Sequence, residues 1–385
     1  MMARALSLVP DESHDAGRLL SRYGGMLGLA ANDYEGSKEA LGRAIAIARR
    51  EKDVGLEIQT LAYAADVSGN HLRWQESVDN GLRAILLATG NENAYSEVLP
   101  RWWTIVSSHH LGNLDLALAH ALPLRALAER RSTPLLLASI ANVPLVSLPC
   151  LVGDWQEGRE NSDRNLELSP VSQAPLGFRV LMEYETGEFD QGEIYLERLL
   201  EAMRLTPGQS FTTGRTSMAI LTAARITGVP KHLDVAESIA KSTLLTQFVP
   251  PLLEMYANAA LAMLAVHKGE QSAVAEHSSS LLKQCGTMLW TTISVDRLLG
   301  LSYQVMENPD QAAAHFEDAL AFCRKAGYRP ELAWTCCDYA DTPLSRNGEG
   351  DRAMASLLLN ESLSIATELG MRPLMERVGA RQEGT

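Results

Sequence analysis

A short sequence pattern recurs along the chain about every 40 residues, and this periodicity restricts the possible folds more than any other feature. Most copies start with Gly, Asn or Asp in a turn, and a small or apolar residue follows within a few positions. These residues, which we call the marker positions, are 37, 77, 117, 158, 192, 236, 274, 312 and 355. A repeat of this length is one supersecondary unit, which buries its apolar face by stacking against its neighbours. The sequence therefore predicts an array of similar units.

The copy in Asn308–Gly327 indicates what one unit contains. Its residues Ala312, Phe316 and Ala319 are spaced i, i+4 and i+7, which places them on one face of an α-helix. Small residues at both ends let a neighbouring helix approach closely, and Phe316 fills the gap between the backbones. The same spacing recurs 43 residues later, starting at Ala355. This arrangement resembles the second helix of a tetratricopeptide repeat (TPR), a unit of two helices joined by a turn.

The turns and the lack of a β pattern favour an all-α fold. Gly or Asn at a turn permits the positive φ that ends a helix, and Asp, Asn or Glu caps the start of the next one. No alternating apolar pattern with hairpin turns competes with this interpretation. We therefore expect a right-handed α–α superhelix, a TPR-like solenoid of about nine helix pairs without a sheet. Pro343, inside the first helix of the last pair, should kink that helix or end it early.

The expected domain organisation is one helical repeat domain over residues 16–378, between a flexible N-terminus, 1–15, and a flexible C-terminal tail, 379–385. The formal net charge of −13 repels phosphate backbones, so we expect no direct nucleic-acid binding. The uncharged run Pro134–Val152 has the length of a membrane span, but two internal prolines favour a buried first helix instead. Five cysteines without a regular framework, and no secretory signal, favour a reducing cytoplasm.

The segment Asn308–Val378 resembles a known bacterial arrangement. Its stretches A-L-A-F-C-R-K-A-G-Y-R-P-E-L-A-W and S-I-A-T-E-L-G-M-R-P-L-M-E-R-V are similar to the TPR-like superhelical arms of large ATP-dependent regulators. These include LuxR-type regulators related to the maltose regulator, and similar arms occur in cyclase–ATPase–TPR proteins. The resemblance implies an arm that senses a ligand or partner and couples it to an ATPase domain in the same or a partner chain.

The chain departs from these families in two ways. It has no G-x-x-x-x-G-K-[ST] motif, so ATPase activity is not expected of these residues. No helix-turn-helix follows Val378, so DNA binding is not expected either. We expect either a free-standing arm or a fragment of a longer protein, and the helical pattern of Met371–Val378 favours the fragment.

The sequence lacks the motifs of common catalytic and metal sites, including G-x-S-x-G and H-E-x-x-H. The neighbours His109 and His110, like Cys336 and Cys337, lie about 100° apart on a helix and therefore point in different directions. The cysteines are expected to be small buried residues. We predict no cofactor, no metal and no enzymatic activity.

The leading functional hypothesis is a cytoplasmic binding module, the protein-interaction or ligand-sensing arm of a bacterial signalling or transcriptional regulator. Its partner would be a protein or peptide, or alternatively a small-molecule effector. A second hypothesis is an assembly scaffold that binds a peptide in its concave groove. A third is an enzyme whose site is built in that groove.

In TPR arrays the first helix of each pair lines the concave face, so polar and aromatic residues there are candidates for ligand contact. Counting back from the marker positions gives Arg22, Gln59, Trp102, His109, Tyr184, Tyr256, His267, Arg297 and Gln304. Trp102 and His109 are seven residues apart and therefore on one helix face. Because Trp103 follows Trp102, we expect one of these side chains to face the core and the other to face outward on the concave side. The alternative is that both tryptophans wedge helix pairs apart.

Overall fold

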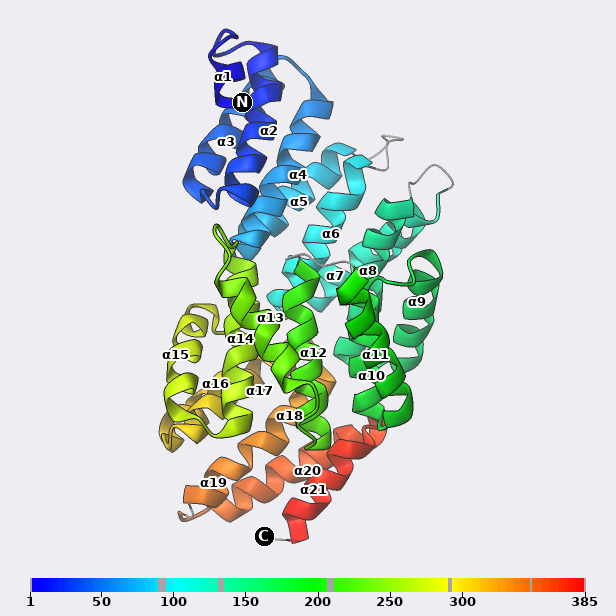
Figure 1. Cartoon of the computed structure of the whole chain (residues 1–385), viewed down its shortest axis with the longest axis vertical. Helices are drawn as coiled ribbons and strands as arrows, with labels where there is room; N and C mark the ends of the chain where they lie inside the picture. Colours follow the sequence, from blue (N-terminus) through cyan, green and yellow to red (C-terminus); the bar gives the residue numbers. More distant parts are fainter. Residues whose placement is uncertain are drawn as a thin grey trace. The chain divides into compact units, whose positions relative to one another are not determined.

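The structure of the chain is a computed structural model that describes residues 2–88, 95–130, 135–205, 211–289, 293–346 and 348–383. Over these ranges it consists of paired α-helices (Figure 1). It also contains one short two-stranded β-ribbon. The chain divides into two compact units, Met1–Pro144 with Thr246–Leu253, and Leu145–Leu245 with Glu254–Thr385. We call these the first unit and the second unit. The single repeat domain expected over residues 16–378 stays a prediction.

Nine helix pairs follow one another in the described part of the chain, in agreement with the expected all-α, TPR-like fold. The first helices of the pairs are α2 (His14–Ala30), α4 (Val54–Asn70), α6 (Tyr95–His110), α8 (Leu135–Val152), α10 (Gln173–Thr186), α12 (Phe211–Thr227), α14 (Pro251–Lys268), α16 (Val295–Val305) and α18 (Arg329–Tyr339). The second helices are α3 (Tyr34–Arg50), α5 (Trp74–Ala88), α7 (Leu114–Ala128), α9 (Trp155–Leu168), α11 (Phe189–Leu205), α13 (Leu233–Leu244), α15 (Gln271–Leu281), α17 (Pro309–Ala326) and α20 (Asp351–Leu369).

The marker positions all lie near the start of these second helices, and all of them are buried. Two are glycines because neighbouring helices approach closely there. A Cβ atom on Gly158 would lie 2.5 Å from the sulfur of Met182, and one on Gly192 would lie 2.7 Å from the ring of Tyr184. Real Cβ atoms do not come so close to other heavy atoms, so the packing of α10 against α9 and α11 depends on these glycines.

Helix boundaries follow the local signals that the sequence carries. Asp53 and Asp154 each accept a hydrogen bond from the backbone N–H three residues later, as N-caps do. Helix α18 ends at Tyr339 and α19 (Asp341–Arg346) follows, which confirms the expected interruption. The physical reason is that Pro343 has no N–H to donate to the carbonyl of Tyr339.

The structure shows helices in both segments expected to be flexible, namely α1 (Met2–Leu6) and the end of α21 (Arg372–Glu383). The flexibility of these segments stays a prediction. One feature differs from the expectations. Strands β1 (Met288–Leu289) and β2 (Ile293–Ser294) pair antiparallel after the 3-10 helix η1 (Leu282–Gln284), so the prediction of no sheet is wrong. Both strands are buried, and their pairing satisfies backbone groups that have no access to water.

The uncharged run near residue 144 is part of helix α8, and its residues 141–152 are mostly buried, as predicted for a first helix. Pro134, which begins the run in the sequence, lies outside the described residues. Among the helices that the structure describes, none has both the length and the apolar composition that crossing a bilayer requires. Four cysteines are buried as expected, and Cys285 is exposed.

Candidate functional site

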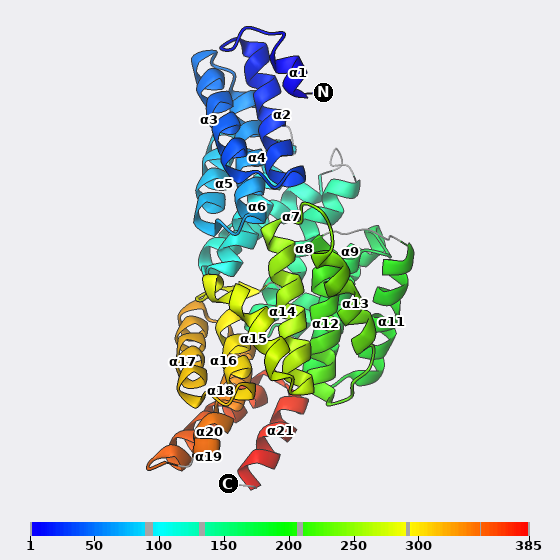
Figure 2. The ribbon, with the colours of Figure 1, turned by 60° about the vertical axis from the view of Figure 1, so that its left-hand side comes forward.

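The second unit closes on itself through contacts between its early and late helices. Trp155 Nε1 donates a hydrogen bond to the carbonyl of Leu369 over 2.7 Å. Arg372 Nε donates to the carbonyl of Thr186 over 3.0 Å, and α21 contacts α10 and α12 (Figures 1 and 2). These partners are far apart in the sequence, so the first helices of this unit face a shared interior.

A network of buried ion pairs fills that interior, with Asp338 of α18 at its centre. The Asp338 side chain has no exposure and accepts hydrogen bonds from Arg225 at 2.7 Å and from Arg297 Nε at 2.9 Å. Arg297 also donates to Glu331 at 2.6 Å. Glu331 in turn accepts the backbone N–H of Ser294 at 2.7 Å. Each buried charge therefore has a partner of opposite charge, as burial requires.

Trp334 extends this network towards α10 and α21. Its Nε1 donates to the carboxyl of Glu185 over 2.7 Å. The guanidinium groups of Arg297 and Arg377 lie 5.5 Å and 4.9 Å from the ring centroid, within cation–π distance. Arg377 also donates to the backbone carbonyl of Arg225. The side chains of five helices thus meet at one aromatic ring and one carboxylate.

The network separates the pKa values of its carboxyl groups. Burial opposes ionisation of Asp338, but Arg225, Arg297 and a third arginine outweigh it and hold the Asp338 pKa well below its usual range. At Glu185 burial dominates over the Trp334 hydrogen bond and raises the pKa to about 7. The charge of Glu185 therefore changes near neutral pH.

The space inside the network is too small for a ligand. The cavity is lined by Glu185, Thr222, Arg225, Ile226, Met263, Ile293, Arg297 and Trp334, and its volume is ≈ 20 Å³. A cavity of this size holds about one water molecule. The network therefore serves the packing of the second unit, and ligand binding needs another surface.

A larger pocket of ≈ 520 Å³ lies between α10, α11, α12 and α21, and we call it the α11 pocket. Its apolar lining residues are Phe189, Leu196, Ile220, Ala223, Ala224, Ile226, Val229 and Pro373. Its polar lining residues are Tyr184, Asp190, Glu193, Thr227, Lys231 and Glu376. The volume is within the range of small-molecule and peptide side-chain sites.

The aromatic side chains of the α11 pocket are held in place by their neighbours. The rings of Tyr184 and Phe189 lie 5.8 Å apart at 44°. Tyr184 donates its hydroxyl proton to Glu193 over 3.2 Å, and burial together with this carboxylate raises the Tyr184 pKa to about 12. Tyr184 is therefore a protonated donor at neutral pH. Phe189 remains 42% exposed, an apolar surface that water covers poorly.

The charge of the α11 pocket is negative. Lys231 forms an ion pair with Glu193. Asp190 and Glu376 are exposed, and within the described ranges neither has an ion-pair partner. An apolar floor below unpaired carboxylates favours a ligand that carries a positive charge next to an apolar group.

The first unit contains four of the predicted contact residues. Arg22 on α2 and Gln59 on α4 are exposed, whereas His109 on α6 is buried at 1% exposure. Trp102 and Trp103 are 8% and 3% exposed and meet edge to face with ring centroids 4.9 Å apart. The expectation that one tryptophan faces outward is therefore wrong, because α6 is packed against α4, α5 and α7. The ligand contacts proposed for these residues stay predictions.

The second unit contains the other five predicted residues. Tyr184 lines the α11 pocket, Tyr256 is fully buried and His267 is exposed. Arg297 and Gln304 both bind Asp338 of α18. Arg297 donates to the carboxylate of Asp338, and Gln304 Nε2 donates to its backbone carbonyl over 2.9 Å. These two side chains stabilise the interior. The cavity that Arg297 lines has a volume of ≈ 20 Å³, which is too small for a ligand.

Sequence reasoning missed most of the buried network and most of the pocket. One signal was present: Glu331, Trp334 and Asp338 are spaced i, i+3 and i+7, on one face of a first helix. Two acids and a tryptophan on one face of an otherwise apolar helix indicate a buried polar cluster. No comparable signal marks the α11 pocket, because its walls come from segments that are not adjacent in the sequence.

No protein-family model matches this sequence, and no curated protein does either. Among solved structures, a chain from the crystal structure of the APC/C hetero-tetramer Cut9–Hcn1 is similar with a TM-score of 0.56 and 17% identity. The match covers 94% of this chain and 63% of that chain, so this chain spans less than two thirds of its length. A circular tandem repeat protein with enhanced subunit contact surfaces matches at 15% identity over 97% and 96% of the two chains, but its TM-score of 0.24 carries no argument. The first similarity supports the TPR-like fold.

Proposed function

We propose that the chain is a non-enzymatic binding module, and that its α11 pocket binds a protein segment with a Lys or Arg beside an apolar side chain. The observation that carries this proposal is the combination of an exposed Phe189 with the unpaired carboxylates of Asp190 and Glu376. Covering an exposed aromatic ring inside a concave site removes apolar surface from water, which makes ligand binding more favourable. The two carboxylates favour a cationic group at the same place.

The magnitudes favour a modest, salt-sensitive interaction. A hydrogen bond to a charged group contributes about 1.5–3 kcal/mol when it is shielded from water. Burial of an apolar side chain adds roughly 25 cal/mol per Å² of apolar area removed from water. The net charge of −13 attracts basic partners at a distance, and this attraction weakens as ionic strength rises.

The nature of the partner rests on two further considerations. The similar chain belongs to a hetero-tetramer, an assembly of protein chains, which favours a protein partner over a small-molecule effector. The resemblance of Asn308–Val378 to arms of bacterial ATP-dependent regulators favours a role in signalling or transcription, with a partner that carries an ATPase domain. In this proposal the chain acts in the cytoplasm, and the alternatives are an assembly scaffold or an enzyme with a site in the groove.

A displayed library of random peptides tests the proposal directly. Selection on the purified chain should enrich peptides in which Lys or Arg lies within a few residues of an aromatic or aliphatic side chain. The double variant Asp190→Asn, Glu376→Gln should bind the selected peptides at least tenfold more weakly, equivalent to about 1.4 kcal/mol or more. Glu167→Gln changes an exposed carboxylate of α9 outside the pocket, and should leave affinity unchanged.

Two results would overturn the proposal. Equal binding by the double variant and the parent chain would exclude the α11 pocket as the peptide site. Nucleotide hydrolysis by the purified chain, absent from a mock purification, would contradict the non-enzymatic assignment.

A further inference from the structure

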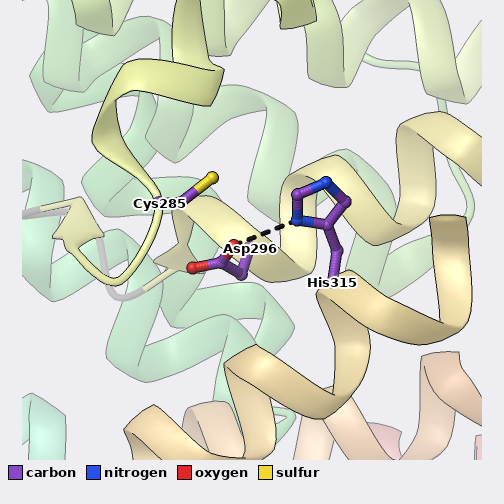
Figure 3. Close-up of side chains that lie close together, drawn as sticks. All are labelled: Cys285, Asp296 and His315. Carbon is purple, nitrogen blue, oxygen red and sulfur yellow. Dashed lines mark hydrogen bonds and ion pairs between the residues drawn. The ribbon is translucent and has the colours of Figure 1, made fainter.

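We infer that Cys285, Asp296 and His315 bind Zn²⁺ or a chemically similar divalent cation. One potential ligand atom from each residue lies within 4.8 Å of the other two. The residues come from three segments: the turn after η1, the first turn of α16, and α17. Figure 3 shows the Asp296 carboxylate between the thiol and the imidazole. This site shares no residue with the α11 pocket, so the inference is independent of the proposed function.

The distances suit a tetrahedral metal ion after small side-chain movements. His315 Nδ1 lies 3.1 Å from one carboxylate oxygen of Asp296. With Zn–ligand bonds of about 2.0–2.3 Å, neighbouring ligand atoms of a tetrahedral site lie ~3.5 Å apart. The His315 and Asp296 atoms therefore need to move apart slightly, and the Cys285 sulfur, within 4.8 Å of both ligand atoms, needs to approach them by at most ~1.3 Å. Rotation of the exposed Cys285 side chain provides most of that movement.

The ligand set selects the class of metal. A thiolate and an imidazole are soft and intermediate ligands, which Mg²⁺ and Ca²⁺ avoid and Zn²⁺ prefers. Three protein ligands leave a fourth position for water or for a group from another molecule, the arrangement of an open zinc site. Because Cys285 is exposed, that position is accessible from solvent.

The surrounding residues orient the ligands. Asp296 is 1% exposed, and its second carboxylate oxygen accepts a hydrogen bond from the backbone N–H of Gly286 over 2.6 Å. The His315 ring stacks on Tyr303, with centroids 5.3 Å apart and an angle of 8° between the planes. Outer contacts of this kind fix ligand orientation in metal sites. Two of the three ligands are thus held in position before metal binds.

A second cluster of possible ligands lies elsewhere in the described residues and suits Zn²⁺ less well. The other cluster of possible ligands, Glu193, Glu197 and His232, has no sulfur, and its Glu193 is already held by an ion pair.

Cobalt provides the test, because a thiolate bound to Co²⁺ absorbs through ligand-to-metal charge transfer. The untagged chain, first stripped with a chelator, should bind one equivalent of Co²⁺ with this absorption and release it when Zn²⁺ is added. Cys285→Ser should abolish the absorption, and His315→Ala should weaken Co²⁺ binding at least tenfold. His232→Ala, a matched change in the other cluster, should leave both unchanged.

The controls make a negative result informative. The far-UV circular dichroism spectrum of each variant should match that of the parent chain. For Cys285→Ser this follows from the exposure of Cys285, because the substitution leaves the core unchanged. Absence of thiolate–cobalt absorption in the parent chain, or its persistence in Cys285→Ser, would overturn the inference.

Discussion

Glu185→Gln isolates the energetic cost of one buried carboxyl group. The glutamine keeps the size of the side chain, and its carbonyl oxygen can still accept the hydrogen bond from Trp334 Nε1. It cannot ionise. The comparison therefore measures how ionisation of Glu185 changes the free energy of unfolding. The charged neighbours that act on Glu185 are Arg297, Arg377 and Glu331.

The magnitude and sign follow from the pKa. Burial raises the pKa of Glu185 from 4.5 to about 7 in the folded chain, so the folded state binds a proton more tightly than the unfolded state. Stability from this group is fully present below pH 4.5 and is lost as the pH rises through about 7. One pKa unit corresponds to about 1.4 kcal/mol, so the loss amounts to ~3 kcal/mol. The glutamine variant has no such loss.

Urea unfolding at several pH values between 4.5 and 8 measures the effect. The free energy of unfolding of Glu185→Gln, relative to the parent chain, should rise by ~3 kcal/mol across this range and then level off. The exposed Glu167→Gln serves as a control, with a difference from the parent chain that stays constant. Parallel curves for Glu185→Gln and the parent chain would refute the reasoning, because they would mean that Glu185 titrates alike in both states.

Two further predictions concern charge and packing. Asp338→Asn removes the carboxylate shared by two arginines and should lower the free energy of unfolding by about 3–5 kcal/mol in urea denaturation. A loss below ~1 kcal/mol would contradict this prediction, because it would mean that water can replace the ion pairs. Gly69→Ala places a Cβ 2.0 Å from the Trp103 ring and should cost about 1–3 kcal/mol. Its control, Gly42→Ala on an exposed helix face with no atom within 4 Å, should instead stabilise by about 0.5–1 kcal/mol. Equal melting temperatures for the two alanine variants would contradict the close contact at Gly69.

The second helices were predictable because their requirement is local. Each needs a small or apolar residue at the point where the neighbouring helix approaches, and this need recurs with every repeat. Gly158 and Gly192 satisfy it by lacking a Cβ atom, and Ala312 by having no side-chain heavy atom beyond Cβ. Caps such as Asp53 are equally local. A pattern that repeats along the chain therefore places the helix pairs without knowledge of the tertiary structure.

The candidate site was harder to predict because it depends on which helix faces remain free. The first helices were expected to expose one face to a groove. Helix α6 instead contacts α4, α5 and α7, so both Trp102 and Trp103 are buried. In the second unit, Trp334 reaches Glu185 across 149 residues of sequence. A local repeat pattern carries no information about pairing at that separation.

Helix α21 contacts helices of the interior of the second unit and also lines its pocket. Arg377 of this helix lies on the ring of the buried Trp334, so α21 places a cation of the chain itself at the interior. Two buried carboxylates of the network, Asp338 and Glu331, are already paired with Arg225 and Arg297. The same helix contributes Pro373 and Glu376 to the α11 pocket. Helix α21 therefore takes part both in closing the interior and in forming the α11 pocket, the ligand site that we propose for this unit.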